Sequence, residues 1–110
     1  MNFELEKNWR ETVKKIAGNF GEQMDLQSIL FVIGLQELKI ELGKLSKDQK
    51  IETIHVGICT ILAPYGYYEP LGLDNDGWPH FKELKKIPNV NEKQQEEILK
   101  QAVIDYFESN

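Results

Sequence analysis

Two helix-start signatures of the same kind constrain what this sequence can fold into. The segment Ser46–Gln49 fits a capping box, in which the Ser46 hydroxyl accepts a hydrogen bond from the Gln49 amide and the Gln49 side chain reaches back. Asn91–Gln94 repeats the arrangement with asparagine in place of serine. Apolar residues recur at helical spacing behind each start. The sequence therefore predicts one helix that ends before Pro64, because proline disfavours the α conformation of the preceding residue, and another after Asn91.

Two earlier segments, at residues 3–17 and 26–42, carry the same periodicity. In the first, Trp9, Val13 and Ile16 mark one face of a helix, and Gly18 or Gly21 is the expected stop residue. Asp25 is a suitable N-cap for the second, and Gly43 is a suitable residue just beyond its end. The first half of the second segment is apolar on nearly all sides. That pattern is typical of a helix buried centrally or in an interface.

Two glycines, Gly34 and Gly57, fall in the middle of predicted helices. A glycine at such a position costs about 1 kcal/mol relative to alanine, which a close helix crossing would offset. Only a short connection separates the two helices, so we expect them to be neighbours. We therefore expect the two glycines to face each other or to face the first helix.

The region after Pro64 carries no clear helical period. Pro79 favours the start of a short helix, to which Phe81 and Leu84 would give an apolar side and which Pro88 would close. The expected fold is therefore all-α, a single helical domain over residues 1–110. It would be a compact bundle of four main helices plus one short helix. A long aromatic-rich loop, at about residues 64–78, would join the third helix to the short one.

Composition excludes several classes of protein. The chain is 41% hydrophobic and 28% charged, which is ordinary for a folded globular domain. Its net charge of -5 disfavours general nucleic-acid binding. The longest apolar run, Ile29–Leu35, is too short to span a membrane, and no apolar stretch near the N-terminus indicates a signal peptide. A single cysteine, Cys59, cannot form an intramolecular disulfide, so the expected location is cytoplasmic.

The stretch from Tyr65 to Phe81 differs in kind from the rest of the chain, because it is rich in aromatic residues, glycine, proline and acids. Long loops of this kind often carry function, although aromatic residues also pin a loop onto helices. Six residues in it are candidates for ligand binding: Tyr68, Glu69, Asp74, Asp76, Trp78 and His80.

Part of this stretch resembles a calcium loop, since Asp74, Asp76 and Gly77 fit its third, fifth and sixth positions. Gly72 then occupies the first position, where calcium requires a carboxylate, so a turn with Asp76 capping the short helix is the stronger interpretation.

His55 and Cys59 are four residues apart on the third predicted helix and share a face. With His80 they could supply three ligands to a transition metal, because thiolate and imidazole suit zinc. The alternative is that Cys59 is a small core residue. A Cys-His nucleophile would need an electropositive setting and a third group that the sequence does not supply. No cofactor motif and no catalytic residue stands out.

The leading functional hypothesis is a non-enzymatic interaction module that binds a protein partner or self-associates as a homo-oligomer. It depends on the apolar first half of the second helix, which a four-helix domain of this size does not easily cover. The alternative is a small-ligand or cation-binding domain in which Tyr68, Glu69, Trp78 and His80 converge on one pocket. An enzyme with acid and base groups in the 65–81 loop comes third, and neither a nucleic-acid nor a membrane partner is expected.

Overall fold

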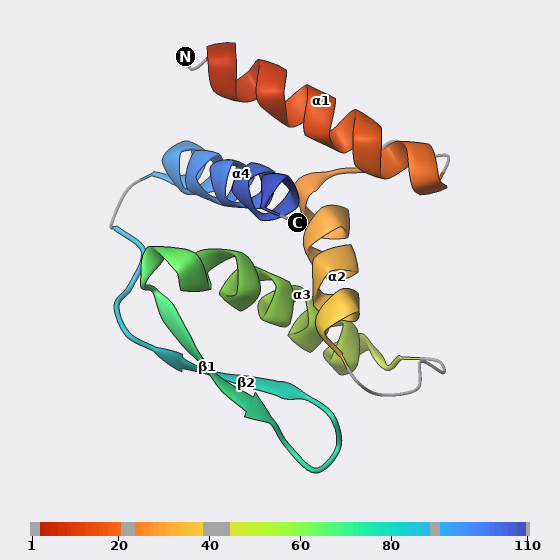
Figure 1. The fold of residues 1–110 in the computed structure, drawn as a ribbon, viewed down its shortest axis with the longest axis vertical. Helices are drawn as coiled ribbons and strands as arrows, with labels where there is room; N and C mark the ends of the chain where they lie inside the picture. The colour runs from red at the N-terminus through yellow and green to blue at the C-terminus, as the bar shows by residue number, and fades with distance from the viewer. Residues whose placement is uncertain (1–2, 21–23, 39–44, 89–90, 110) are drawn as a thin grey trace.

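The computed structural model describes residues 3–20, 24–38, 45–88 and 91–109. Four helices surround one core, and a two-stranded antiparallel sheet projects below them (Figure 1). The described elements, in chain order, are α1 (Phe3–Phe20), α2 (Leu26–Glu37), α3 (Lys47–Leu62), the short 3₁₀ helix η1 (Ala63–Tyr65), β1 (Tyr68–Leu73), β2 (Pro79–Glu83) and α4 (Glu92–Glu108). None of the described helices is both long enough and apolar enough to cross a membrane.

The predicted helix starts are confirmed at α2, α3 and α4. The Ser46 hydroxyl accepts from the Gln49 amide at 3.1 Å, and the Gln49 side chain accepts from the Ser46 amide at 2.8 Å. Asn91 makes the same reciprocal pair at the start of α4. The carboxylate of Asp25 accepts from the Ser28 amide at 2.8 Å and caps α2. Each cap satisfies backbone donors that the first helical turn leaves unpaired.

The predicted helix ends are less accurate than the starts. The helix α2 ends at Glu37 rather than at residue 42, and Leu38 follows it in an extended conformation. Gly43 and Gly21, two of the predicted stop residues, lie outside the described residues. Gly18, the other predicted stop, lies inside α1. At α3 the predicted end is confirmed, because the α-helix ends at Leu62 and Pro64 falls in the 3₁₀ helix η1. The stated reason is not confirmed, since Ala63 before the proline keeps an α conformation.

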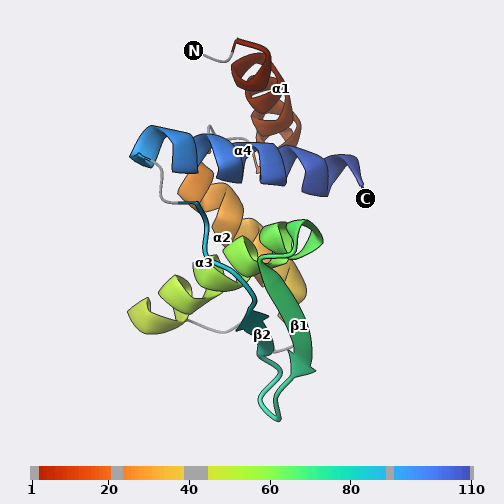
Figure 2. The same ribbon diagram turned by 90° about the vertical axis from the view of Figure 1, so that its left-hand side faces the viewer.

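The two central glycines mark a close crossing of α2 and α3, which is visible in two perpendicular views (Figures 1 and 2). A Cβ built on Gly34 would lie 2.0 Å from the backbone oxygen of Thr53. A Cβ built on Gly57 would lie 2.2 Å from the backbone oxygen of Leu30 and 3.3 Å from the Gly34 nitrogen. The expectation that the two glycines face each other is confirmed. Because neither helix carries a side chain there, their backbones touch directly.

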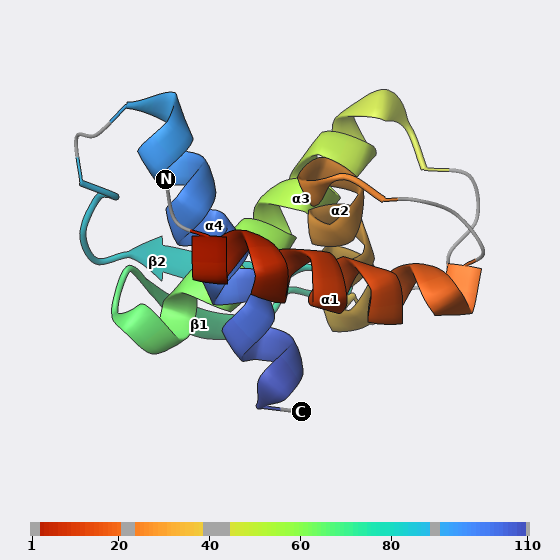
Figure 3. The ribbon, with the colours of Figure 1, turned by 90° about the horizontal axis from the view of Figure 1, so that it is seen from above.

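The core forms where α2 and α3 meet α4. Ile33, Leu62 and Val103, one residue from each helix, are fully buried in it. The helix α1 lies across α4 on the far side from the sheet (Figure 3) and buries Trp9 and Ile16. Each helix therefore contributes its apolar stripe to a single cluster.

The apolar first half of α2 is covered within this one chain. Ile29, Leu30 and Ile33 are buried, and Phe31 and Val32 are half-buried. The structure therefore removes the main reason for expecting self-association, which was an apolar helix surface too large for the domain to cover.

The all-α prediction is wrong in the region after η1. Pro79 opens the strand β2 rather than a short helix, and the predicted loop contains the strand β1. The two strands pair antiparallel, with Tyr68 opposite Glu83 and Leu73 opposite Pro79. The register shifts by one residue between Pro70 and Gly72, which marks a β-bulge. The correct description is four helices plus a β-hairpin.

The position of Pro79 in the hairpin explains why the predicted short helix is a strand instead. The Asp74 amide donates to the Trp78 carbonyl at 2.9 Å, so the neighbouring pair Leu73 and Pro79 falls at a position without ladder hydrogen bonds. Pro79 therefore loses no strand pairing through its missing N–H. A helix of one or two turns in the same place would have been marginal without strong packing. The bulge also breaks the alternation of residue types that normally indicates a strand.

Candidate functional site

Four of the six candidate ligand residues lie at the tip of the hairpin. One oxygen of the Asp74 carboxylate accepts from the amides of Asp76 and Trp78, at 2.8 and 3.0 Å. The other oxygen lies 2.8 Å from Nε2 of His80. Gly77 closes the turn at a φ of 86°, a conformation that favours glycine. The carboxylate at the calcium-like position therefore holds the turn together, and Asp76 caps no helix.

The Asp74–His80 pair is an exposed acid and base. The His80 side chain is 58% exposed. The hydrogen bond from His80, followed by the amide of Trp78, lowers the pKa of Asp74 below its usual 3.8. The pair is thus built to keep the carboxylate ionised while it orders the turn.

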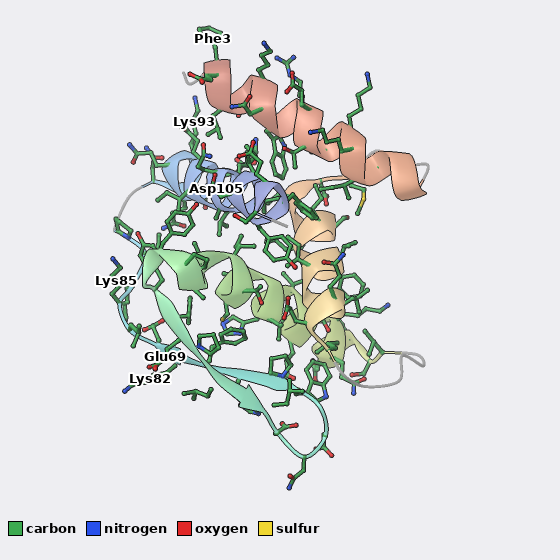
Figure 4. All side chains as sticks on the ribbon, viewed as in Figure 1. Phe3, Glu69, Lys82, Lys85, Lys93 and Asp105 are labelled. Carbon is green, nitrogen blue, oxygen red and sulfur yellow. The ribbon has the colours of Figure 1, made fainter. Side chains whose placement is uncertain are left out.

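The other two candidates, Tyr68 and Glu69, lie at the opposite end of the hairpin. Tyr68 packs edge-on against His55 of α3, with ring centroids 6.3 Å apart. Glu69 is paired across the sheet with Lys82, and both are labelled at that end of the hairpin in Figure 4. The six candidates therefore form two separate groups. The pocket expected from Tyr68, Glu69, Trp78 and His80 does not form.

His55 and Cys59 lie together as the helical spacing predicts, with the sulfur 3.8 and 3.9 Å from the two ring nitrogens. Cys59 is fully buried. Burial, followed by the charge of Glu83, raises the pKa of its thiol to about 11. The thiol therefore stays protonated at neutral pH, which suits a core residue and not a nucleophile.

The metal hypothesis required His80 to join His55 and Cys59. His80 pairs with Asp74 at the hairpin tip instead. Within residues 3–20, 24–38, 45–88 and 91–109, no three His, Cys, Asp or Glu side chains converge on a point that could hold a metal ion.

A different feature offers a binding surface: an open cavity of about 280 Å³ between the C-terminal ends of α3 and α4. Both ends lie on the same side of the molecule in Figure 2. The cavity wall is mostly apolar, and Asp105 is its only charged member among the residues that the structure describes. Its lining residues are Thr60, Ile61, Pro64, Tyr65, Ala102, Asp105, Tyr106 and Ser109.

A second open cavity, of about 270 Å³, lies on the other side of Thr60, between α3 and the hairpin. Its wall is also mostly apolar, and its lining residues are Glu37, Thr60, Ala63, Pro70, Gly72, Leu73, Pro79, His80 and Phe81. Thr60 lines both cavities, so the two cavities adjoin at this residue near the C-terminal end of α3. We call the two adjoining cavities together the α3 groove.

Two tyrosine–carboxylate pairs stand along the α3 groove. The Tyr65 hydroxyl donates to the Asp105 carboxylate. The Tyr106 hydroxyl lies 3.4 Å from the carboxylate of Glu37 and 3.2 Å from the side-chain oxygen of Gln36. Burial raises the pKa of both phenols, to about 12 for Tyr65, and the adjacent carboxylates add to the effect. Both hydroxyls therefore remain protonated donors over the physiological pH range.

A third cavity, of about 370 Å³, lies between α1, α2 and α4. Its lining carries both signs of charge, from Lys15, Glu11 and Glu108, and it also includes the apolar residues Ile16 and Phe107. Such a mixed wall is typical of a gap between two amphipathic helices. The α3 groove differs from it in being mostly apolar and in having no lysine or arginine among its lining residues.

Sequence reasoning missed most of the α3 groove because its residues come from distant segments. Only Tyr65 and the hairpin residues belong to the stretch that was singled out. One signal was present for Asp105, which falls near the C-terminal end of α4, where the helix dipole disfavours a carboxylate. No signal existed for Thr60, which looks like an ordinary helix residue.

No family model matches the chain, and no curated protein or solved structure matches it either. What the α3 groove binds must therefore follow from its own shape and charge. Its lining combines apolar surface near the C-terminal end of α3, aromatic residues from both cavities, and acidic groups. Among the described lining residues there is no lysine or arginine, and the one histidine, His80, is paired with Asp74.

Proposed function

We propose that this protein is a non-enzymatic interaction module that binds an amphipathic segment of a partner protein in the α3 groove. The observation that carries the proposal is the meeting of two apolar cavities at Thr60. An open apolar groove beside a helix suits the apolar face of a partner segment. The apolar surface would supply affinity, and the tyrosine hydroxyls and carboxylates along the groove would fix the register.

Side-chain exposure at the two ends of the α3 groove supports a protein partner. Tyr65 at one end is 41% exposed, and Leu73 at the other is 50% exposed. Leu71, next to Leu73 on the hairpin, is 61% exposed. Apolar and aromatic groups gathered on one surface are typical of interaction sites. A small molecule in either cavity would leave Leu71 uncovered, because Leu71 lines neither of them.

Selection from a library of random peptides displayed on phage, each long enough for several helical turns, tests this proposal. The blocked variant Thr60→Trp places a large ring where the two cavities meet. Glu52→Trp adds the same ring at an exposed position of α3 that does not line the groove. Leu73→Ser removes an exposed anchor with little risk to folding.

We expect peptides that bind the wild type and Glu52→Trp with equal strength and bind both Thr60→Trp and Leu73→Ser more weakly. Circular dichroism and a thermal melt would establish that each variant is folded. Peptides that bind Thr60→Trp as tightly as the wild type would refute docking in the α3 groove. Light scattering after size exclusion would show whether a second copy of the chain occupies the groove instead, since blocking Thr60 would then dissociate a dimer.

A further inference from the structure

The end of the α3 groove next to α4 is a mostly apolar open cavity with one negatively charged side chain in its described lining. Ile61, Pro64 and Ala102 contribute apolar surface to its wall. Tyr65 and Tyr106 add aromatic rings, and among the described lining residues Asp105 is the only charged one. We call this end the Asp105 subsite. Its volume of about 280 Å³ accommodates one long side chain.

The Asp105 carboxylate is held in place by neutral donors. One oxygen accepts from the side-chain amide of Gln101 at 3.0 Å, and the other accepts from the Tyr65 hydroxyl. Within the part of the chain that the structure describes, no lysine, arginine or histidine forms an ion pair with Asp105. A carboxylate retains further lone pairs after two such hydrogen bonds. The subsite thus presents a half-buried negative charge whose position is fixed but which is not neutralised.

From this geometry we infer that the Asp105 subsite binds a lysine or arginine side chain of the partner segment. This inference rests on the proposed function. The aliphatic stem of the basic side chain would lie on the apolar floor, and its cationic head would meet Asp105 and the tyrosine rings. Charge complementarity favours this occupant, because the chain has a net charge of -5 and the described lining of the Asp105 subsite includes no lysine, arginine or histidine.

Small analogues of the two basic side chains allow a direct test. Amide spectra of the isotope-labelled full chain would be followed during titration with n-butylammonium and with n-propylguanidinium. The neutral compound n-butanol serves as a control of similar shape. Asp105→Asn removes the charge and keeps the size of the side chain. Glu52→Gln removes the same charge from an exposed position outside the groove, so it controls for long-range electrostatics.

We expect both cations to shift the amides of Thr60, Ala102 and Asp105, and n-butanol to shift them far less. Asp105→Asn should weaken cation binding about tenfold, as the loss of a charge-assisted hydrogen bond implies. Glu52→Gln should leave it within about twofold. Equal binding of n-butanol and the cations, or unchanged cation binding by folded Asp105→Asn, would overturn the inference.

Peptide selection repeated on Asp105→Asn separates this inference from the proposed function. Peptides selected on the wild type should carry a lysine or arginine at a fixed distance from their apolar anchors, and those selected on Asp105→Asn should not. If basic residues are equally frequent in both pools, the subsite inference fails while the interaction module stands. If no peptide distinguishes the wild type from Thr60→Trp, the interaction module itself fails.

Discussion

Replacing Gly34 with alanine is the most demanding test of the fold. The added Cβ would lie 2.0 Å from the Thr53 carbonyl oxygen and 2.9 Å from its carbon, and both atoms belong to the backbone. A backbone atom cannot rotate away as the end of a side chain can. The helices α2 and α3 must therefore move apart by about 1 Å before the Cβ reaches even the shortest contact found in real proteins.

The size of the effect follows from two opposing terms. Overpacking of a core typically costs about 1–3 kcal/mol, and a contact with backbone belongs at the upper end. The higher helix propensity of alanine offsets about 1 kcal/mol of that cost. Separation of the helices also loosens the packing around Ile29 and Ile33, which are fully buried. We expect a net loss of about 2 kcal/mol in the free energy of unfolding, or roughly 10 °C in melting temperature for a domain of this size.

Thermal and urea unfolding of Gly34→Ala, Gly57→Ala and the double variant would measure this effect. The double variant should lose less than the sum of the single losses, because both substitutions act on the same crossing. Gly18→Ala is the matched control, since a Cβ on that exposed helical glycine meets nothing within 4 Å and should raise stability by about 1 kcal/mol. A Gly34→Ala protein that melts at or above the wild-type temperature would refute the close crossing.

Three further predictions concern titratable groups. The pKa of the Asp74 carboxyl should lie below 3.8 in the folded protein and should move toward 3.8 in His80→Ala. The stabilising effect of this carboxylate is present above pH 3.8 and is lost as the pH falls through the folded pKa. Cys59 should react with a thiol reagent at pH 8 only as fast as the core opens, because burial raises its pKa to about 11; fast labelling of native protein would contradict this. Tyr65 should ionise near pH 12, with its stabilising effect present below pH 10 and lost as the pH rises toward 12, and absorbance titration of Tyr65→Phe should lack that late step.

The helical part of the fold could be predicted because its signals are local. The caps at Ser46 and Asn91 involve residues three apart in sequence, and each is found where the sequence places it. The Gly34–Gly57 crossing could also be predicted from the sequence, because a glycine inside a helix costs stability unless close packing requires it. The hairpin was missed because Pro79 carries a helix-start signal and the bulge near Gly72 hides the strand period.

The candidate site could be predicted only in part, because it is assembled by tertiary packing. The aromatic content of the 65–81 stretch drew attention to the segment that forms the hairpin, but Tyr68 and His80 lie apart on it. The α3 groove depends on how the ends of α3 and α4 come together, which places Thr60 beside Asp105. Residues that far apart in sequence carry no shared local pattern. Their proximity follows from the helix crossings, which side-chain periodicity does not specify.

The most direct test of the central claim is to map where a selected peptide binds. Amide spectra of the isotope-labelled chain would be recorded with increasing amounts of the tightest peptide from the phage selection. If the peptide docks in the α3 groove, we expect saturable shifts of the amide signals of Thr60, Ala63 and Tyr65. We expect no shift at Thr12 or Lys15, which line the cavity beside α1. Shifts confined to that other cavity, or scattered over the whole surface without saturation, would contradict docking in the α3 groove.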